Sequence, residues 1–234
     1  MEFADRTVMI TGAAGHLGRA VAAAFAAQGA RLALADLRLE SLERAYGDEG
    51  ERRLFVAVDL LDAAALDAAV DAVVARWQRI DVLCNIAGGF RMGDPVHATS
   101  DADWNFLFDI NARTLLHASR AVVPRMLDAG GGRIVNVGAW AAQHGAAGKG
   151  AYVAAKSAVV RLTESMALEL RERGVNVNCV LPTIIDTPDN RASMPGADPA
   201  RWVAPADLAS VIVFLASDAA RAVHGAALPV SGLS

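Results

Sequence analysis

A tyrosine and a lysine four residues apart, Tyr152 and Lys156, are the residues of this chain whose types and spacing most directly imply chemistry. On an α-helix, residues at this spacing lie on the same face, so the phenol and the ammonium would be neighbours. A nearby ammonium favours the phenolate and would move the pKa of Tyr152 from about 10 toward physiological pH. The pair can therefore transfer a proton, although the same spacing also occurs on solvated helix faces without any active site.

A glycine-rich segment near the N-terminus favours the catalytic interpretation of this pair. Gly12, Gly15 and Gly18 follow an apolar run and open a helix-like stretch. Glycines permit a tight turn and a close approach of ligand to backbone, and the free N–H groups of a helix N-terminus attract a pyrophosphate. The segment predicts a dinucleotide site; the alternative is a purely structural turn between a strand and a helix.

The cofactor preference is indicated by Asp36, which ends the second apolar run. A carboxylate at this place can accept a hydrogen bond from the adenosine ribose and would repel a 2′-phosphate. NAD(H) is therefore the preferred cofactor. NADP(H) is not excluded, because Arg38 could bind the 2′-phosphate; its alternative role is a solvated charge at the start of a helix.

These residues need a scaffold that brings them together, and the chain supplies one by alternating short apolar runs with longer amphipathic ones. Continuous apolar strands separated by helices predict a parallel sheet covered on both faces. We expect a Rossmann-type, doubly wound α/β fold of about seven strands. The expected strands are Thr7 to Thr11, Arg31 to Asp36, Leu54 to Val58, Ile80 to Asn85, Gly132 to Val137, Val175 to Leu181 and Ala227 to Val230. The expected helices are Leu17 to Gln28, Leu39 to Tyr46, Ala63 to Trp77, Asp101 to Leu127, Ala151 to Arg173 and Pro205 to Ala216.

Length and composition limit the remaining possibilities. With 234 residues, 54% of them hydrophobic, the chain can bury one large core, and residues 1–234 are expected to form a single domain. The net charge of −4, with 22 basic residues scattered among 26 acidic ones, argues against nucleic-acid or anionic-membrane partners. The N-terminus has no basic signal-peptide region, and no apolar run approaches about 20 residues, so a cytoplasmic protein is expected.

The two cysteines are expected to be structural. Cys84 and Cys179 lie within apolar, strand-like runs, which is typical of buried free thiols. No group of cysteines and histidines has the spacing of metal ligands, so no metal is expected.

Over essentially its whole length the chain resembles the short-chain dehydrogenase/reductase family. Further matching motifs are Asp59-Leu60 after the third strand, Asn85-Ile86-Ala87-Gly88 after the fourth, Asn111 in a long helix, and Pro182 to Thr187 after the sixth. The resemblance implies hydride transfer from or to a nicotinamide, with Tyr152 as proton donor in the reductive direction. It also implies that Lys156 binds the nicotinamide ribose and that Asn111 helps to hold a relay water.

The same resemblance implies the cofactor contacts and the quaternary structure. The cofactor contacts would come from Gly12, Gly15, His16, Leu17, Gly18, Asp36, Asp59, Leu60, Asn85, Ala87, Gly88, Tyr152, Lys156, Pro182, Ile185 and Thr187. The family uses the two long helices, here Asp101 to Leu127 and Ala151 to Arg173, as a self-complementary interface. A homodimer or homotetramer is therefore expected.

Departures from the family pattern bear on the substrate. His16, Ile86 and Thr183 stand where the family commonly has Gly, Asn and Gly. The largest departure is Ala139, thirteen residues before the tyrosine, where the family carries a serine that donates a hydrogen bond to the substrate oxygen. Losing one such donor can cost about 10²- to 10³-fold in rate. Gln143 or His144 could substitute for the serine; His144 could equally be an exposed loop residue.

The dihydropteridine reductases, a branch of this family, also lack that serine, and the chain resembles them locally. The likeness lies in Ala87-Gly88-Gly89-Phe90, in the spacing of the glycine turn, and in the loop from Asp186 to Pro195 with Trp202. Asn111 departs from that branch. A quinonoid dihydropterin is an activated hydride acceptor and would need a polarising serine less than a plain ketone does.

Three functions remain open from the sequence. The first is reduction of a conjugated carbonyl or imine of the quinonoid dihydropteridine kind. The second is general oxidation and reduction of secondary alcohols and ketones, and the third is a dinucleotide-binding scaffold or redox sensor that has lost its chemistry. The segment of residues 183–202 is too long for a bare connection and is expected to be a substrate loop. Apolar walls for a flat substrate could come from Phe90, Met92, Trp140 and Met194, whose alternative role is simple packing in the core.

Overall fold

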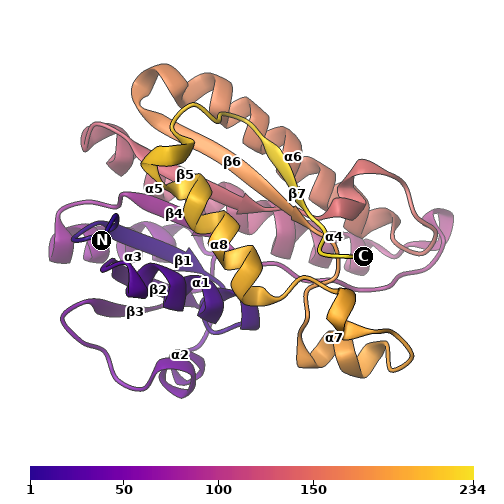
Figure 1. The fold of residues 1–234 in the computed structure, drawn as a ribbon. Coiled ribbons are helices and arrows are strands. Elements are labelled where there is room, and N and C mark those ends of the chain that lie inside the picture. The colour runs from indigo at the N-terminus through magenta and orange to yellow at the C-terminus, as the bar shows by residue number, and fades with distance from the viewer.

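A single parallel sheet organises the chain, which the computed structural model describes from residue 1 to residue 234. Its seven strands lie in the order β3-β2-β1-β4-β5-β6-β7 (Figure 1). They are β1 (Thr7–Thr11), β2 (Arg31–Asp36), β3 (Arg53–Ala57), β4 (Val82–Asn85), β5 (Gly132–Val137), β6 (Val175–Pro182) and β7 (Ala227–Val230). The expected doubly wound α/β fold is confirmed, and the strand ends differ from the predicted ones by two residues at most.

Eight helices accompany the strands. They are α1 (His16–Ala27), α2 (Leu39–Tyr46), α3 (Ala63–Trp77), α4 (Asp101–Phe108), α5 (Thr114–Asp128), α6 (Gly150–Leu170), α7 (Pro188–Ser193) and α8 (Pro205–Ala216). None of them is long and apolar enough to cross a membrane.

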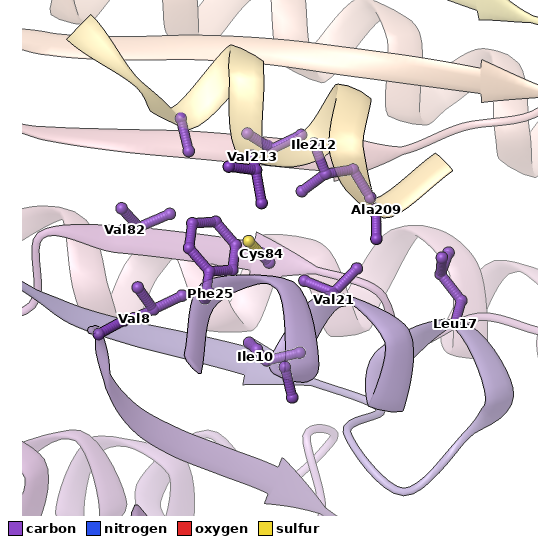
Figure 2. Packing of buried hydrophobic residues seen from close by; sticks show 14 of the residues in the cluster. Val8, Ile10, Leu17, Val21, Phe25, Val82, Cys84, Ala209, Ile212 and Val213 are labelled. Atoms are coloured by element: carbon purple, nitrogen blue, oxygen red, sulfur yellow. The ribbon is translucent and has the colours of Figure 1, made fainter. Parts of the chain in front are cut away.

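Apolar packing on both faces explains why the central strands have no polar alternation. All five residues of β1 and all eight of β6 are buried. On one face, α1 and α8 pack together over β1 and β4, where Phe25 and Val213 lie close to Val8 and Cys84 (Figure 2). On the other face, the core includes side chains of α3, α5 and α6. Cys84 and Cys179 are both fully buried, as expected.

The strand order places the ligand site. The chain runs from β1 outward to β3 and then returns to β4 on the other side of β1, so β1 and β4 are neighbours whose connections diverge. In open α/β sheets, ligands bind at the carboxyl ends of the strands at such a point. Thr11 at the end of β1 ties the two carboxyl ends together, because its hydroxyl accepts hydrogen bonds from the N–H groups of Ile86 and Ala87.

The prediction of one regular helix from Asp101 to Leu127 is wrong in its continuity. A π-helical turn at Asp109–Arg113 separates α4 from α5. Within that turn, Asn111 donates hydrogen bonds to the carbonyl oxygens of Leu107 and Gly89 and accepts one from the N–H of Gly89. π turns of this kind often mark functional sites.

The expected substrate loop is a folded segment containing α7, a helix that the sequence analysis missed. The hydroxyl of Thr187 caps α7 by accepting from the N–H of Asn190, and Pro188 occupies the first helical position. A bridge between Ile185 and Val203 closes the base of the loop. Thr-Pro is a common helix start, so the signal for α7 was present in the sequence.

Candidate active site

The glycine turn after β1 is held tightly against the turn after β4. Gly12 has φ +64°, and a side chain there would place its Cβ 2.9 Å from the Cα of Ala87. At Gly18 a Cβ would lie 2.3 Å from the carbonyl oxygen of Gly12. Both positions therefore require glycine. The turn after β1 and the turn after β4 lie against each other at the carboxyl edge of the sheet.

The N-terminus of α1 lies directly after the glycine turn, and the backbone N–H groups of its first turn are free. Gly15 is the N-cap and supplies no side chain to the first-turn N–H groups, and the first turn carries no acidic residue. His16, which replaces a usual glycine, has its Nδ1 2.9 Å from the guanidinium of Arg19, so its side chain interacts along its own helix. Unsatisfied amides at a helix N-terminus are suited to a diphosphate.

The carboxylate of Asp36 lies beside the glycine turn. Its Oδ2 accepts a hydrogen bond from the N–H of Ala14 at 2.9 Å, and its Oδ1 accepts one from the N–H of Leu37 at 2.9 Å. Each oxygen retains a further acceptor site for a ribose hydroxyl. Arg38 is the exposed N-cap of α2.

A buried acceptor without a partner lies at the end of β4. The Nδ2 of Asn85 donates to Asn136 at 2.9 Å, while the Oδ1 of Asn85 has no hydrogen-bond partner. Buried polar atoms are normally satisfied, so this oxygen can accept a hydrogen bond from a ligand at the carboxyl edge of the sheet. The free amides of α1, Asp36 and Asn85 together fit a dinucleotide crossing the carboxyl ends of the strands.

Tyr152 and Lys156 lie on α6, next to this edge. Lys156 is 5% exposed, and its Nζ donates to the carbonyl oxygen of Val137, at the end of β5, at 2.8 Å. A Cβ added at Gly88 would lie 3.2 Å from that Nζ and 3.0 Å from the Oδ1 of Asn111. The structure thus places Gly88, Asn111 and Lys156 close together.

Burial acts on the pKa values of Tyr152 and Lys156 in the direction opposite to the one expected from their spacing. Burial raises the pKa of Tyr152 to about 12 and lowers the pKa of Lys156 to about 8. The reason is that both groups lose hydration, which disfavours their charged forms. Tyr152 is therefore a neutral phenol at pH 7, which is the form that can donate a proton to a substrate.

Asn111 shapes the substrate side of the site. Asn111 is 2% exposed, and its side chain hydrogen-bonds both the N–H and the carbonyl oxygen of Gly89. The next residue, Phe90, lies edge-on to the ring of Tyr152, with centroids 4.9 Å apart and an interplanar angle of 87°. The predicted role of Asn111 in a water relay remains a prediction.

Ala139 stands at the position of the family's serine and has no hydroxyl. Ala139 follows β5 directly and is 6% exposed. Gln143 and His144 end the turn after it with exposed side chains that make no hydrogen bond to the site. Trp140 is 39% exposed, Phe90 is 54% exposed, and Met194 is half-buried just after α7.

The remaining predicted cofactor residues already have structural contacts of their own. Asp59 accepts from the N–H of Leu61, and Leu60 is buried. Pro182 ends β6 beside Val230, and the Thr187 hydroxyl is engaged in capping α7. Their contacts with a dinucleotide, and that of Ile185, remain predictions.

Several residues that sequence reasoning missed support the site. Asn136 of β5 accepts a hydrogen bond from Asn85 of β4 and donates one of 2.8 Å to the hydroxyl of Thr163 on α6. These buried hydrogen bonds connect β4 and β5 to α6, the helix that contains Tyr152 and Lys156. Lys149 places its Nζ 5.6 Å from the ring centroid of Phe90. A polar residue inside an apolar strand was a detectable signal for Asn136, whereas nothing in the sequence indicated the contact of Lys149.

Comparisons with known proteins agree with this geometry. Residues 6–197 match the family model of the short chain dehydrogenases. The chain is 39% identical over 240 residues to D-threitol dehydrogenase of Mycolicibacterium smegmatis, covering 97% of this chain and 92% of that protein. NAD+-bound xylitol dehydrogenase has a TM-score of 0.90 at 27% identity, covering 99% of this chain and 100% of that one.

A second solved structure, carveol dehydrogenase from Mycobacterium avium in complex with NAD, has a TM-score of 0.89 at 30% identity, covering 98% of this chain and 97% of that one. The family match covers far more than half of the residues, and the glycine turn, Asn111, Tyr152 and Lys156 all lie within it. The chain belongs to the short chain dehydrogenase family and is an NAD(P)-dependent oxidoreductase.

Proposed function

We propose that this protein transfers hydride between the nicotinamide C4 of NAD(H) and a secondary alcohol or ketone, with Tyr152 as the proton donor in the reductive direction. The observation that carries the proposal is the placement of Tyr152 on the same helix as the buried Lys156, whose Nζ is bound at the end of β5, beside the edge of the sheet that fits a dinucleotide. The relatives named for threitol, xylitol and carveol support this class of substrate over a pteridine.

Different residues of the chain would bind the cofactor and transfer the proton. A bound dinucleotide supplies or accepts the hydride. The free amides of α1 bind its diphosphate, and Asp36 accepts from the adenosine ribose. Lys156 orients the nicotinamide ribose, and Tyr152 gives its proton to the carbonyl oxygen during reduction. In the oxidative direction the phenolate form of Tyr152 receives the proton of the alcohol. Phe90 and Trp140 line the approach of the substrate with apolar surface.

A second candidate function is favoured by one specific observation, the alanine at position 139. Without a hydroxyl donor, the site polarises a plain ketone less well. A conjugated carbonyl or imine, such as a quinonoid dihydropterin, is already activated and needs less help. The local resemblance to dihydropteridine reductases gives this candidate its substrate class.

A substrate panel separates the candidates. Steady-state rates with NADH are measured on cyclic and open-chain ketones, on quinones and on a quinonoid pterin, and with NAD+ on the corresponding alcohols and polyols. We expect turnover of alcohols and ketones. Turnover of quinonoid substrates alone would favour the second candidate, and tight NADH binding without any turnover would favour a non-catalytic scaffold.

The cofactor preference gives a prediction at Asp36. Asp36→Asn keeps an oxygen that can accept from Ala14 but removes the charge that repels a 2′-phosphate. We expect the ratio of the Kd for NADPH to that for NADH to fall about tenfold, a change of about 1.4 kcal/mol. Calorimetric titration of both cofactors measures it, with wild type binding NADH more tightly.

Two further variants serve as controls for this prediction. Asp36→Ala loses the hydrogen bond from Ala14 as well and should weaken the binding of both cofactors. If wild type instead binds NADPH more tightly and Arg38→Ala abolishes that preference, Arg38 and not Asp36 selects the cofactor.

We also propose that the protein self-associates as a homodimer or homotetramer. Large apolar side chains are exposed on three neighbouring helical segments, namely Trp104 on α4 (45%), Leu116 on α5 (42%) and Leu168 on α6 (65%). Exposed apolar surface of this kind is typical of an interface. Light scattering at micromolar concentration should give two or four times the chain mass of 24.4 kDa, and a monomer mass would contradict the proposal.

A further inference from the structure

We infer that Tyr46, the last residue of α2, is a positioning residue for the dinucleotide, because it fixes the orientation of the glycine turn. Its hydroxyl donates a hydrogen bond of 2.6 Å to the carbonyl oxygen of Ala13, 33 residues earlier in the chain. This inference rests on the proposed dinucleotide binding and adds a residue to it that lies outside the glycine motif.

The contact of Tyr46 acts on a single peptide unit. The carbonyl of Ala13 and the N–H of Ala14 belong to the same planar group, and that N–H donates to the Oδ2 of Asp36 at 2.9 Å. Tyr46 therefore binds the carbonyl end of this peptide plane, and Asp36 binds its N–H end. Rotating this peptide would break both hydrogen bonds at once, so its orientation is fixed before any ligand arrives.

The clamped peptide immediately precedes the amides that bind a diphosphate. Gly15, whose N–H bonds back to the carbonyl of Gly12, follows Ala14 directly and is the N-cap of α1. The direction in which the first free N–H groups of α1 point depends on the peptide planes leading into the helix. A clamp on the plane between Ala13 and Ala14 thus preorganises the anion site, which lowers the entropic cost of binding.

The sequence around α2 explains how Tyr46 reaches the turn. Leu42 and Tyr46 are four residues apart and share one face of α2, and Leu42 is fully buried in the core. The ring of Tyr46 packs against Phe55 of β3 with centroids 6.2 Å apart, and the guanidinium of Arg53 lies 5.7 Å from its centroid. Burial raises the pKa of Tyr46, so its hydroxyl stays protonated and can donate.

The position of Tyr46 distinguishes its effect from that of Asp36. Asp36 discriminates between the cofactors through the charge it presents to the ribose, whereas Tyr46 acts on a backbone group that serves both. Loss of the Tyr46 hydroxyl should therefore weaken NADH and NADPH by the same factor and leave the preference unchanged.

The test is Tyr46→Phe, which removes the hydroxyl and keeps the ring. We expect the Kd for NADH and for NADPH to rise together by about three- to tenfold, as expected for one lost hydrogen bond. The KM for NADH should rise equally, and kcat at saturating NADH should stay within about twofold of wild type.

A matched control separates positioning from general stability. Phe55→Leu loosens the same corner of the fold but leaves the hydrogen bond to Ala13 in place, so it should lower the unfolding temperature without changing the Kd for NADH. An unchanged Kd in Tyr46→Phe, or an equal rise of Kd in both variants, would overturn the inference. Failure of wild type to bind either dinucleotide would instead refute the proposed function itself.

Discussion

Replacing Tyr152 with Phe should lower kcat/KM for a plain ketone by about 10²- to 10⁴-fold, the usual contribution of a positioned general acid. The change removes only the hydroxyl, because the edge-on ring contact with Phe90 can be kept by a phenylalanine. Partial burial raises the pKa of Tyr152, which favours the protonated phenol that can give a proton to the carbonyl oxygen. Steady-state kinetics with NADH, alongside the Kd for NADH in the same variant, measure the loss.

Ser157→Ala is a suitable control for this variant. It removes another hydroxyl from α6, one that bonds the carbonyl of Ala142 and does not reach the reacting atoms, and kcat should change by no more than about threefold. An activated quinonoid substrate that can take its proton from water should lose less than a ketone in Tyr152→Phe. Unchanged turnover of every substrate in Tyr152→Phe would show that the proposed mechanism is wrong.

The second large effect is a gain. Ala139→Ser restores a hydroxyl at the end of β5, where a donor to the substrate oxygen is missing, and should raise kcat/KM for plain ketones by up to about 10²-fold. Reduction of a quinonoid substrate should stay within a few-fold, since its carbonyl or imine is already activated. Parallel kinetics on both substrate classes measure the difference.

Ala141→Ser controls for the added hydroxyl itself. It makes the same chemical change two residues further on, within the turn that follows β5, and should leave both rates close to wild type. Gly138 is unsuitable for a control, because a Cβ there would lie 2.7 Å from the Cδ2 of Leu181. If Ala139→Ser binds NADH normally and gains nothing on any ketone, the missing serine does not limit this enzyme.

Most of the fold could be predicted because strands that are buried on both faces of the sheet have a simple apolar pattern in the sequence. Strands such as β1 and β6 are continuous apolar runs for that reason, and their ends are marked by Gly12 and Pro182. The π turn at Asp109–Arg113 could not be predicted, because it coincides with contacts between Asn111 and a loop 22 residues earlier. Local periodicity contains no information about such a contact.

The site shows the same division between local and distant information. Tyr152, Lys156, Asp36 and the glycines are recognisable from type and spacing, and the structure places them along one edge of the sheet. Burial raises the pKa of Tyr152, whereas the spacing to Lys156 alone predicts a lowered one, since spacing reports which groups are neighbours but not how far each loses hydration.

Supporting residues are the hardest to find from sequence. Tyr46 contacts Ala13 across 33 residues, and the buried link from Asn136 to Thr163 spans 27 residues, so neither leaves a local pattern. The substrate class expected from the sequence differs from the one that the relatives support. The alanine at position 139 favoured an activated acceptor, whereas the relatives named for threitol, xylitol and carveol support alcohols and ketones.

The most direct test of the central claim follows the hydride itself. Wild type is incubated with ketones of the panel and with NADH deuterated at one or the other position of the nicotinamide C4, and the products are analysed by mass spectrometry. We expect deuterium from one of the two labelled cofactors on the carbinol carbon of the product, and at least a hundredfold slower transfer with Tyr152→Phe. Tight binding of NADH with no deuterium in any product would contradict the account.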